Sequence, residues 1–316
     1  MKLVFLGTGD IALPTLNCLL HAPGHEVLAV VTQPDRPAGR GNKLQVPRTK
    51  ELALAAGVPV LQPERVRRQA ALAELRAYPA DVFVVMAYGQ ILPDALLAMP
   101  RLACVNLHAS LLPRHRGASP VHAAVLAGDA QSGITLMHVA QELDAGDMII
   151  AHSLDLSPRE TAGSLHDRLA DLGPGLIAEG LALLEAGTAP RLPQDPALVT
   201  HAPKLDRDSG KLDWSQDSVT LDRTARGLHP WPGVWTEFGD DKRQRLKILE
   251  AFPESLPDSA SPGTIARITA DGIWVACGNG AEALRLTQVQ PEGRKAMSAR
   301  DFANGVPHLL GSRLGG

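Results

Sequence analysis

Two different patterns of hydrophobic and polar residues divide the chain. In the first part, short unbroken apolar runs alternate with longer stretches in which apolar and polar residues are interspersed. Unbroken runs of four to eight apolar residues are typical of buried strands, and longer amphipathic stretches are typical of helices. Their alternation predicts an α/β fold with a doubly wound, mainly parallel sheet. The predicted strands are residues 2–6, 27–32, 59–62, 82–87, 103–105 and 134–139, and the predicted helices are residues 13–20, 50–56, 70–76, 121–127 and 165–185.

The pattern changes after residue 185. Residues 186–204 contain four prolines and little periodicity, which is typical of a linker, and a long loop is likewise predicted at residues 33–46. Beyond Trp214 the pattern is one of short strands separated by Asp-Gly and Asn-Gly turns, as in a small OB-like β-barrel. We therefore predict a first domain at 1–189, a linker at 190–206 and a C-terminal domain at 207–316. The predicted C-terminal strands are residues 247–249, 263–266, 272–275 and 283–286.

Composition narrows the class of protein. A chain of 316 residues with 45% hydrophobic and 21% charged residues is ordinary for a globular enzyme of two domains. No apolar run approaches the ~20 residues of a membrane span, and we expect no membrane association. Three scattered cysteines without metal-ligand spacing predict a cytoplasmic protein without a bound metal. The net charge of −3 does not favour nucleic acid binding, so any RNA contact has to come from local patches.

Polar residues that can take part in catalysis follow the apolar run at residues 103–105. Asn106 and His108 share one face of the strand because side chains alternate along it. Pro113 and Gly117 then predict a loop, which places the pair at the strand edge where α/β proteins bind ligands. Asp144 follows about one βαβ unit later, so we expect a neighbouring strand to present its carboxylate to the same pocket.

An amide, an imidazole and a carboxylate together indicate acid–base and oxyanion chemistry. Asn106 can donate to a developing oxyanion, and His108 can donate likewise or carry a proton. Asp144 can orient the imidazole or accept a proton. No cysteine adjoins them, and the rival nucleophile Ser110 lacks a G-x-S-x-G elbow, so the nucleophile is expected to be the substrate. The alternative interpretation is a hydrogen-bonded polar pair at a strand end without catalytic function.

The longer motif carries a family resemblance. Asn-Leu-His-Ala-Ser-Leu-Leu-Pro-Arg-His-Arg-Gly at residues 106–117, followed by Leu-Asp-Ala-Gly-Asp at 143–147, closely resembles the formyltransferases that use 10-formyltetrahydrofolate. The resemblance implies that Asn106, His108 and Asp144 are the catalytic trio and that a substrate amine attacks the formyl carbon directly. It also implies a Rossmann-like core and an OB-like second domain. The folate contacts that it implies are Ser110, Leu111, Leu112 and Pro113.

A second motif favours a different enzyme. Residues 7–12 match G-x-G-x-x-A after a strand, with Asp35 beyond the next strand, as in an NAD(P)-dependent oxidoreductase. Asp35 lies between two prolines, however, and the formyltransferases begin with a similar Gly-Thr-Pro-Asp-Phe segment. Here Gly9 and Ile11 replace the Pro and the Phe. The resemblance therefore explains this segment, and the oxidoreductase is the less favoured alternative.

The identity of the amine depends on a basic loop. In residues 35–50 five lysines and arginines stand against one acidic residue, Asp35, which gives this region a charge of about +4. A solvated surface loop would have the same composition, but residues 32–43 resemble the insertion loop of those formyltransferases that act on methionyl initiator tRNA. The resemblance implies that tRNA is bound through Arg36, Arg40 and Lys43.

The C-terminal part adds weaker support for tRNA. Residues 227–235 and 293–298 resemble the same branch, and residues 207–316 carry 14 basic and 14 acidic residues. A tRNA contact in this domain is therefore expected from a patch, such as Lys242, Arg243, Arg245 and Lys247. We expect a monomer. The alternatives are formyl transfer to a nucleotide amino sugar or another small amine, hydrolysis of the formylated folate, and RNA binding without catalysis.

Overall fold

The chain forms two compact units. The computed structural model describes residues 1–38, 43–239 and 243–315. The predicted boundaries at residues 189 and 207 stay predictions, because these units are not continuous in sequence. The first unit consists of Met1–Pro120, Gln131–Asp155 and Leu165–Ala202, and the second of Val121–Ala130, Leu156–Ser164 and Pro203–Gly316.

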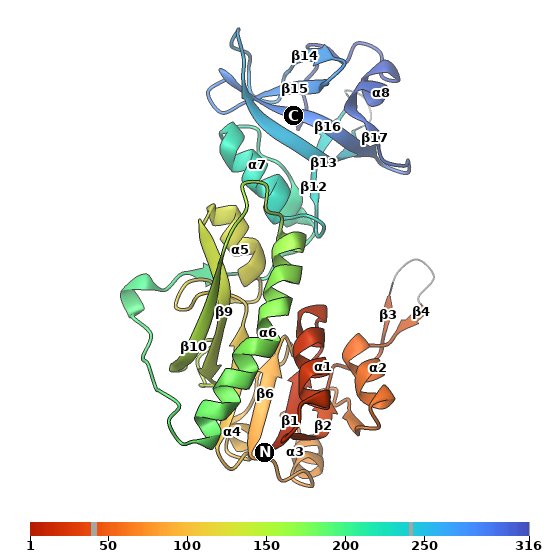
Figure 1. Cartoon of the computed structure of the whole chain (residues 1–316). Helices are drawn as coiled ribbons and strands as arrows, with labels where there is room; N and C mark the ends of the chain where they lie inside the picture. Colours follow the sequence, from red (N-terminus) through yellow and green to blue (C-terminus); the bar gives the residue numbers. More distant parts are fainter. Residues whose placement is uncertain (39–42, 240–242, 316) are drawn as a thin grey trace. The chain divides into compact units, whose positions relative to one another are not determined.

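The first unit contains a seven-stranded sheet whose strand order is β10-β9-β7-β6-β1-β2-β5. Five neighbouring strands, from β7 to β5, are parallel, which confirms the predicted mainly parallel sheet (Figure 1). Their sequences are unbroken apolar runs because both faces of the sheet are covered. The strands are β1 (Lys2–Gly7), β2 (Glu26–Val31), β5 (Val60–Leu61), β6 (Val82–Met86), β7 (Ala103–His108), β9 (Gln131–His138) and β10 (Met148–Asp155).

The last two strands of this sheet correct the sequence prediction. β9 is antiparallel to β7, and β10, which was not predicted, is antiparallel to β9. The strand before Asp144 is therefore a neighbour of β7, as expected, but the parallel βαβ connection that was assumed for it was wrong. Because β9 runs against β7, its last residue His138 pairs with Val105, and the loop that follows has to turn back to reach His108.

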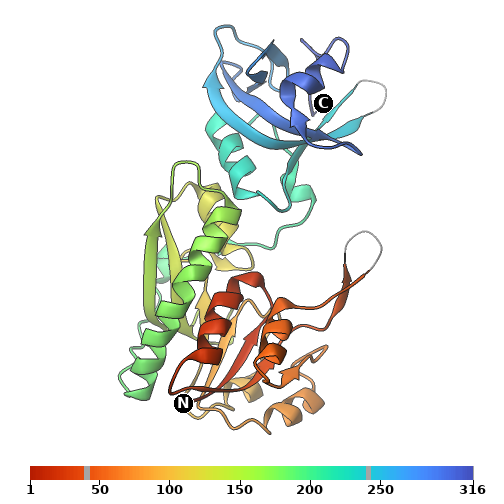
Figure 2. The same cartoon turned by 45° about the vertical axis from the view of Figure 1, so that its right-hand side comes forward.

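The helices of the sheet were mostly predicted. Figures 1 and 2 show α1 and α6 lying over one face of the sheet. Pro14 occupies the first turn of α1, where a missing amide proton costs nothing. Within the described residues no helix is long and apolar enough to cross a bilayer. The helices are α1 (Leu13–His21), α2 (Arg48–Ala55), α3 (Gln69–Leu75), α4 (Asp94–Leu97), α5 (Pro120–Ala127) and α6 (Ala162–Glu185).

Part of the predicted loop at 33–46 is a β-hairpin. β3 (Arg36–Ala38) pairs antiparallel with β4 (Lys43–Gln45), and the hairpin stands out from the first unit beyond α2 (Figures 1 and 2). Strands of three residues are too short to produce a recognisable alternation, which is why the sequence indicated a loop. The residues between the strands, including the predicted tRNA contact Arg40, lie outside the described residues.

The predicted linker is also structured in part. β11 (His201–Ala202) pairs in parallel with β8 (Arg116–Gly117), and Leu192 forms an antiparallel bridge with Met148. A 3-10 turn at Pro196–Leu198 lies between them, begun by the Asp195 side chain, which accepts the Ala197 amide. The segment up to Ala202 therefore packs as part of the first unit and is not a free linker.

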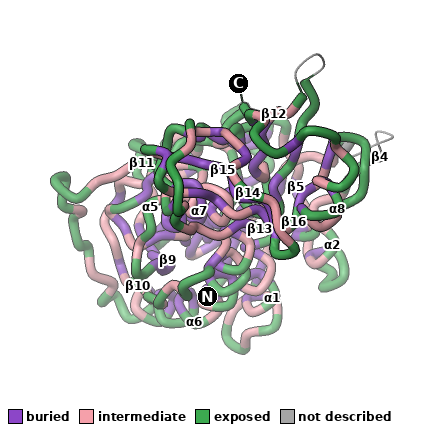
Figure 3. The backbone as a smooth tube through the Cα atoms, turned by 90° about the horizontal axis from the view of Figure 1, so that it is seen from above, coloured by how far each residue is buried: buried purple, intermediate pink, exposed green. Residues whose placement is uncertain are grey.

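The second unit has a six-stranded antiparallel sheet, in line with the predicted β domain. Four of its strands overlap the predicted ones, and the strands at Val234–Phe238 and Met297–Ser298 were not predicted. Its inward residues form one core cluster, and in Figure 3 buried stretches follow β15 and β16. Two helices in this unit were not predicted; Asp217 caps the first and Ser298 the second. The elements are α7 (Ser218–Gly227), β12 (Val234–Phe238), β13 (Gln244–Ser255), β14 (Ile265–Thr269), β15 (Gly272–Cys277), β16 (Glu282–Pro291), β17 (Met297–Ser298) and α8 (Ala299–Asn304).

Candidate active site

The pair Asn106 and His108, predicted from the sequence, lies at the C-terminal end of β7, two residues apart on the strand. Asn106 is half-buried, and His108 is buried. Within the described part of the chain, no side-chain hydrogen bond engages Asn106, so its amide remains able to donate to a ligand. Cys104 precedes the pair, but burial raises the pKa of its thiol to about 12, which keeps it from acting as a thiolate nucleophile.

The structure brings Asp144 to His108. Oδ2 of Asp144 lies 3.5 Å from Nδ1 of His108, and both side chains are almost fully buried. The same oxygen accepts the Gly117 amide at 2.8 Å. Nε2 of His108 donates to the main-chain oxygen of His115 at 2.9 Å, because a carbonyl can only accept. Both ring nitrogens therefore face acceptors, and the ring can donate to both only when it carries both protons.

Unusual backbone geometry is concentrated around this site. His115 and Asp144 have φ angles of 59° and 53°, in the left-handed region that non-glycine residues seldom occupy. Gly117 has φ 123°, and a Cβ there would lie 2.5 Å from the main-chain oxygen of Ala202. Strained residues persist only where the surroundings hold them, and they are often found at functional sites. Here they lie on the two loops that supply the partners of His108.

The predicted folate segment follows β7 and is largely internal. Ser110 is fully buried and donates its hydroxyl to the Arg114 oxygen at 2.6 Å, so it is engaged in holding the loop rather than placed as a nucleophile. Leu112 is also buried, and its amide donates to Thr135 Oγ1. Leu111 and Pro113 are half-buried. Side-chain contact with a ligand is therefore open to Leu111 and Pro113 rather than to Ser110 or Leu112.

Two exposed apolar side chains on neighbouring loops were not singled out from the sequence. Ile91, after β6, is 84% exposed, and Leu143, beside Asp144, is 65% exposed. The amide of Gln141 donates to Asp94, which ties the Leu143 loop to the start of α4. Exposed apolar groups beside a polar site are typical of ligand contacts. Single leucines and isoleucines carry no such signal in a sequence.

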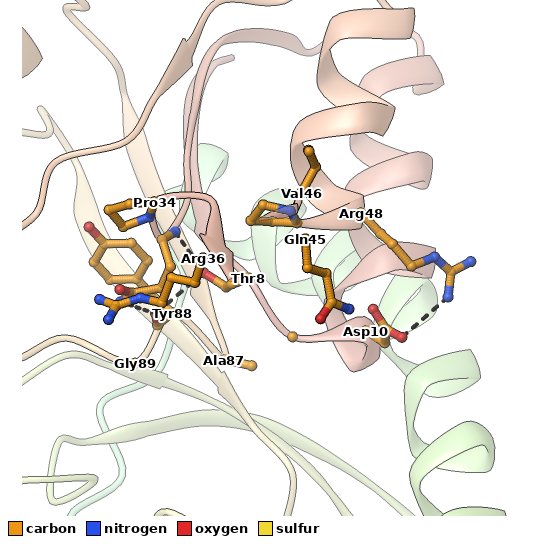
Figure 4. Close-up of a pocket in the computed structure, with 13 residues that line it drawn as sticks. Thr8, Asp10, Pro34, Arg36, Gln45, Val46, Arg48, Ala87, Tyr88 and Gly89 are labelled. Atoms are coloured by element: carbon orange, nitrogen blue, oxygen red, sulfur yellow. Dashed lines mark hydrogen bonds and ion pairs between the residues drawn. The ribbon is translucent and has the colours of Figure 1, made fainter. Parts of the chain in front are cut away.

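A pocket of about 550 Å³ opens at the same edge of the sheet (Figure 4). It lies where β1 meets β6, with β2 on the other side of β1, which is the switch point at which α/β sheets bind ligands. The pocket is built from the loops after β1, β2 and β6 and from the base of the basic hairpin. Its lining is Thr8, Gly9, Asp10, Gln33, Pro34, Arg36, Gln45, Val46, Pro47, Arg48, Ala87, Tyr88 and Gly89.

The pocket has two cationic side chains at its rim. Arg36 is exposed, and no ion pair engages it within the described residues. Arg48 pairs with Asp10 at 3.3 Å, with both side chains more than half exposed (Figure 4). Of the other predicted tRNA contacts, Lys43 lies in β4, and Arg40 is outside the described residues. The rim can therefore attract an anionic ligand through Arg36 above all.

The walls of the pocket are fixed by polar contacts that involve Asp35. Nζ of Lys50 lies 2.7 Å from Oδ2 of Asp35, and the Gln62 amide donates to Oδ1 of Asp35 at 2.7 Å. The hydrogen bond from Gln62, followed by that from Lys50, lowers the pKa of Asp35. Because both oxygens are engaged, Asp35 is not free to bind a ribose hydroxyl. This weakens the oxidoreductase alternative.

The two departures from the family's first segment have different settings. Gly9 has φ −68°, the value that proline fixes, so the backbone here follows a path open to either residue. Ile11 is only 8% exposed and packs in the core, so the residue that replaces the aromatic serves packing. Among the residues that the structure describes, no group of three or more metal-ligating side chains comes together.

The second unit has a basic surface around Trp235. Arg245 stacks over the Trp235 ring at 3.8 Å and lies 3.8 Å from Asp208, while Lys211 lies 5.5 Å from the ring. Arg243 pairs with Glu237 at 3.7 Å. Of the predicted patch, Arg243, Arg245 and Lys247 are exposed, and Lys242 lies outside the described residues.

Comparison with known proteins gives consistent matches. Residues 1–181 match the formyl transferase family, and residues 204–307 match the formyl transferase C-terminal domain. The methionyl-tRNA formyltransferase of Moorella thermoacetica is 45% identical over the whole chain and 99% of its own length. That of Pseudomonas paraeruginosa is 48% identical over 96% of each chain.

Solved structures share the fold at lower identity. HypX from Aquifex aeolicus, in complex with tetrahydrofolic acid, has a TM-score of 0.63 and 18% identity over 98% of this chain and 48% of its own. WlaRD, a sugar 3N-formyl transferase, has a TM-score of 0.65 and 15% identity over 93% of this chain and 99% of its own.

Proposed function

The chain belongs to the formyl transferase family, and on that premise we propose that its catalytic trio formylates the amino group of an aminoacyl-tRNA. The protein transfers the formyl group of 10-formyltetrahydrofolate to the α-amino group of methionyl initiator tRNA, in support of translation initiation. Its full-length relatives at 45–48% identity carry this activity in their names. The observation that carries the mechanism is the convergence of Asn106, His108 and Asp144 at the end of β7.

The trio accounts for the chemistry without a covalent enzyme intermediate. The neutral substrate amine attacks the formyl carbon, a C–N bond forms, and the carbonyl electron pair moves to oxygen. Asn106 donates to this oxyanion. His108 gives a second N–H, for which Nε2 exchanges its hydrogen bond to the His115 oxygen for one to the substrate. Asp144 takes the amine proton, directly or through water. As the intermediate collapses, the bond from carbon to N10 of the folate breaks and N10 receives the proton that Asp144 took from the amine, which returns the enzyme to its starting state.

The folate is expected on the loops beside the trio. Exposed Ile91 and Leu143 offer apolar surface to a planar heterocycle, and Leu111 and Pro113 lie on the adjoining segment. Ser110 and Leu112, also predicted as folate contacts, have buried side chains, and their part would be to hold Leu111 and Pro113 in place. 10-Formyltetrahydrofolate is consumed as a cosubstrate.

The acceptor is expected to bind on the other side of the reacting carbon. The pocket at the ends of β1, β2 and β6 lies next to β7 and carries Arg36 at its rim. A 3′ end of tRNA brings phosphates that such a cation attracts. We propose Arg36, Arg40 and Lys43 as the contacts of the hairpin with tRNA, and Arg245 and Lys247 as contacts in the second unit.

A direct assay tests this function. The protein is incubated with formyl-labelled 10-formyltetrahydrofolate and methionyl initiator tRNA, and the label is followed. We expect it in the aminoacyl ester of the tRNA. Label in a nucleotide amino sugar offered as the competing acceptor would establish the alternative transferase. Label released as formate, independent of tRNA, would establish a hydrolase. If all the label stayed on the folate, the protein would be an RNA-binding module without catalytic activity.

The basic hairpin gives a separate prediction. Arg36→Ala and Arg40→Ala should each weaken tRNA binding and reduce the salt dependence of the binding constant by about one phosphate contact. Binding is measured by filter retention over a range of salt concentrations. Arg67→Ala, at an exposed arginine before α3, is the matched control and should leave the salt dependence unchanged. An unaltered slope in both hairpin variants would remove the hairpin from the tRNA interface.

We further propose that the protein acts as a monomer in the cytoplasm. The three cysteines are free and unclustered, which fits a reducing compartment. Light scattering at assay concentrations tests the oligomeric state, and a mass of twice 33.5 kDa would contradict it.

A further inference from the structure

Gln194 connects the two loops that supply the partners of His108, the His115 oxygen and Asp144. Its Nε2 donates to the main-chain oxygens of Asp144 and Gly146 at 2.8 and 2.9 Å. Its Oε1 accepts from Nε of Arg116 at 2.9 Å. Arg116 lies between His115 and Gly117, whose main-chain groups contact His108 and Asp144. A single half-buried amide, far away in sequence, therefore bridges both loops.

The segment that carries Gln194 is fixed on both sides. Before it, Leu192 and Met148 exchange main-chain hydrogen bonds at 2.9 and 3.0 Å, which ties the segment to the start of β10. After it, the Arg116 amide donates to the Thr200 oxygen at 2.9 Å, and the His115 amide donates to Thr200 Oγ1 at 2.9 Å. Residues 192–202 thus lie across the loop before β10 and the loop after β7. We call these residues the strap.

The strap acts on the groups that set the geometry of the trio. The His115 oxygen holds Nε2 of His108, and the Gly117 amide holds Oδ2 of Asp144. The loop after β9 has to turn back toward His108, and its Asp144 has φ 53°. The local chain favours neither the return of this loop nor the positive φ of Asp144, so a partner from outside the loop has to stabilise them. Gln194 supplies that partner at the main chain of Asp144 itself.

We propose that Gln194 is a positioning residue for formyl transfer, which sets the placement of Asp144 relative to His108. The inference rests on the proposed function of the trio. Displacement of reacting groups by about 1 Å can lower a rate 100-fold, although substrate binding remains intact. A loss of Gln194 should therefore reduce kcat much more than it raises KM.

Two substitutions separate positioning from simple attachment of the strap. Gln194→Met keeps the length of the side chain but loses all its hydrogen bonds. Gln194→Glu keeps the acceptor for Arg116 and adds a charge attraction to it, but it places an oxygen against the Asp144 and Gly146 carbonyls. If Gln194 only anchors the strap through Arg116, the Glu variant should behave like the original protein. If it positions Asp144, the Glu variant should be impaired at least as much as the Met variant.

The test is steady-state kinetics with methionyl initiator tRNA and 10-formyltetrahydrofolate across pH, together with thermal unfolding. We expect both variants to lose about 10- to 100-fold in kcat, with each KM within about twofold. We also expect the pH dependence of kcat to shift, and Tm to stay within a few degrees. Gln290→Met is the matched control, because its amide donates to the Arg294 oxygen within the second unit, and its kinetics should be unchanged.

The outcomes are distinguishable from a failure of the proposed function. Unchanged kcat and pH dependence in both variants, with an active parent protein, would overturn the role of Gln194 alone. The same holds if Gln194→Glu is fully active, or if kcat falls only in proportion to a loss of folded protein. A parent protein that transfers no formyl group to the tRNA would instead overturn the proposed function.

Discussion

Replacement of His108 by alanine is expected to lower the kcat of formyl transfer by about 100- to 1000-fold, the usual effect of removing one transition-state donor. The ring is buried between the His115 carbonyl and the Asp144 carboxylate, so its loss removes both a positioned proton and the partner of Asp144. The binding of tRNA should change little, because the basic hairpin is a separate part of the first unit. Single-turnover formylation and tRNA retention on filters measure the two effects.

A second histidine serves as control for the His108 result. His21→Ala removes a ring at the exposed end of α1 whose one hydrogen bond among the described residues is to the Asn17 oxygen, and it should leave turnover unchanged. Thermal unfolding and folate binding verify that the His108 variant is folded. Retained turnover in a folded His108→Ala protein would remove this residue from the mechanism.

Replacement of Asp144 by asparagine is expected to lower kcat by about 100- to 10,000-fold, the range for loss of a positioned acid–base group. The two side chains have the same shape, and asparagine tolerates the positive φ of this position. Its amide oxygen can still accept from Gly117. The variant therefore removes the negative charge beside His108 and the proton acceptor, with the loop intact. Rates are measured across pH with both substrates near saturation.

The matched control for this variant is Asp171→Asn, at an exposed position of α6, which should retain full activity. If Asp144→Asn shows the parent rate and pH dependence, the carboxylate is not the proton acceptor. A rise in KM alone would place Asp144 in substrate binding instead.

Local sequence patterns predict a strand well when the strand is buried along its whole length. β6 is buried along its whole length, and its unbroken apolar sequence predicted it. β10, at the sheet edge, has one buried residue and otherwise consists of half-buried and exposed positions, and it was missed. β8 and β11 have two residues each, and their partners are 85 residues apart in sequence. Such short elements exist only because a distant segment pairs with them.

The same distinction applies to the site. By itself the sequence determined the α/β class, the family and the three side chains proposed to react, because these depend on residue type at close spacing. Only the tertiary structure decided that Asp144 reaches His108 from an antiparallel neighbour and that Gln194 bridges the two loops. It also decided that the His115 oxygen contacts His108 and that the Gly117 amide contacts Asp144. The physical reason is that every residue carries a main-chain carbonyl, and every residue but proline an amide, so that only the path of the chain determines which of them meet a side chain.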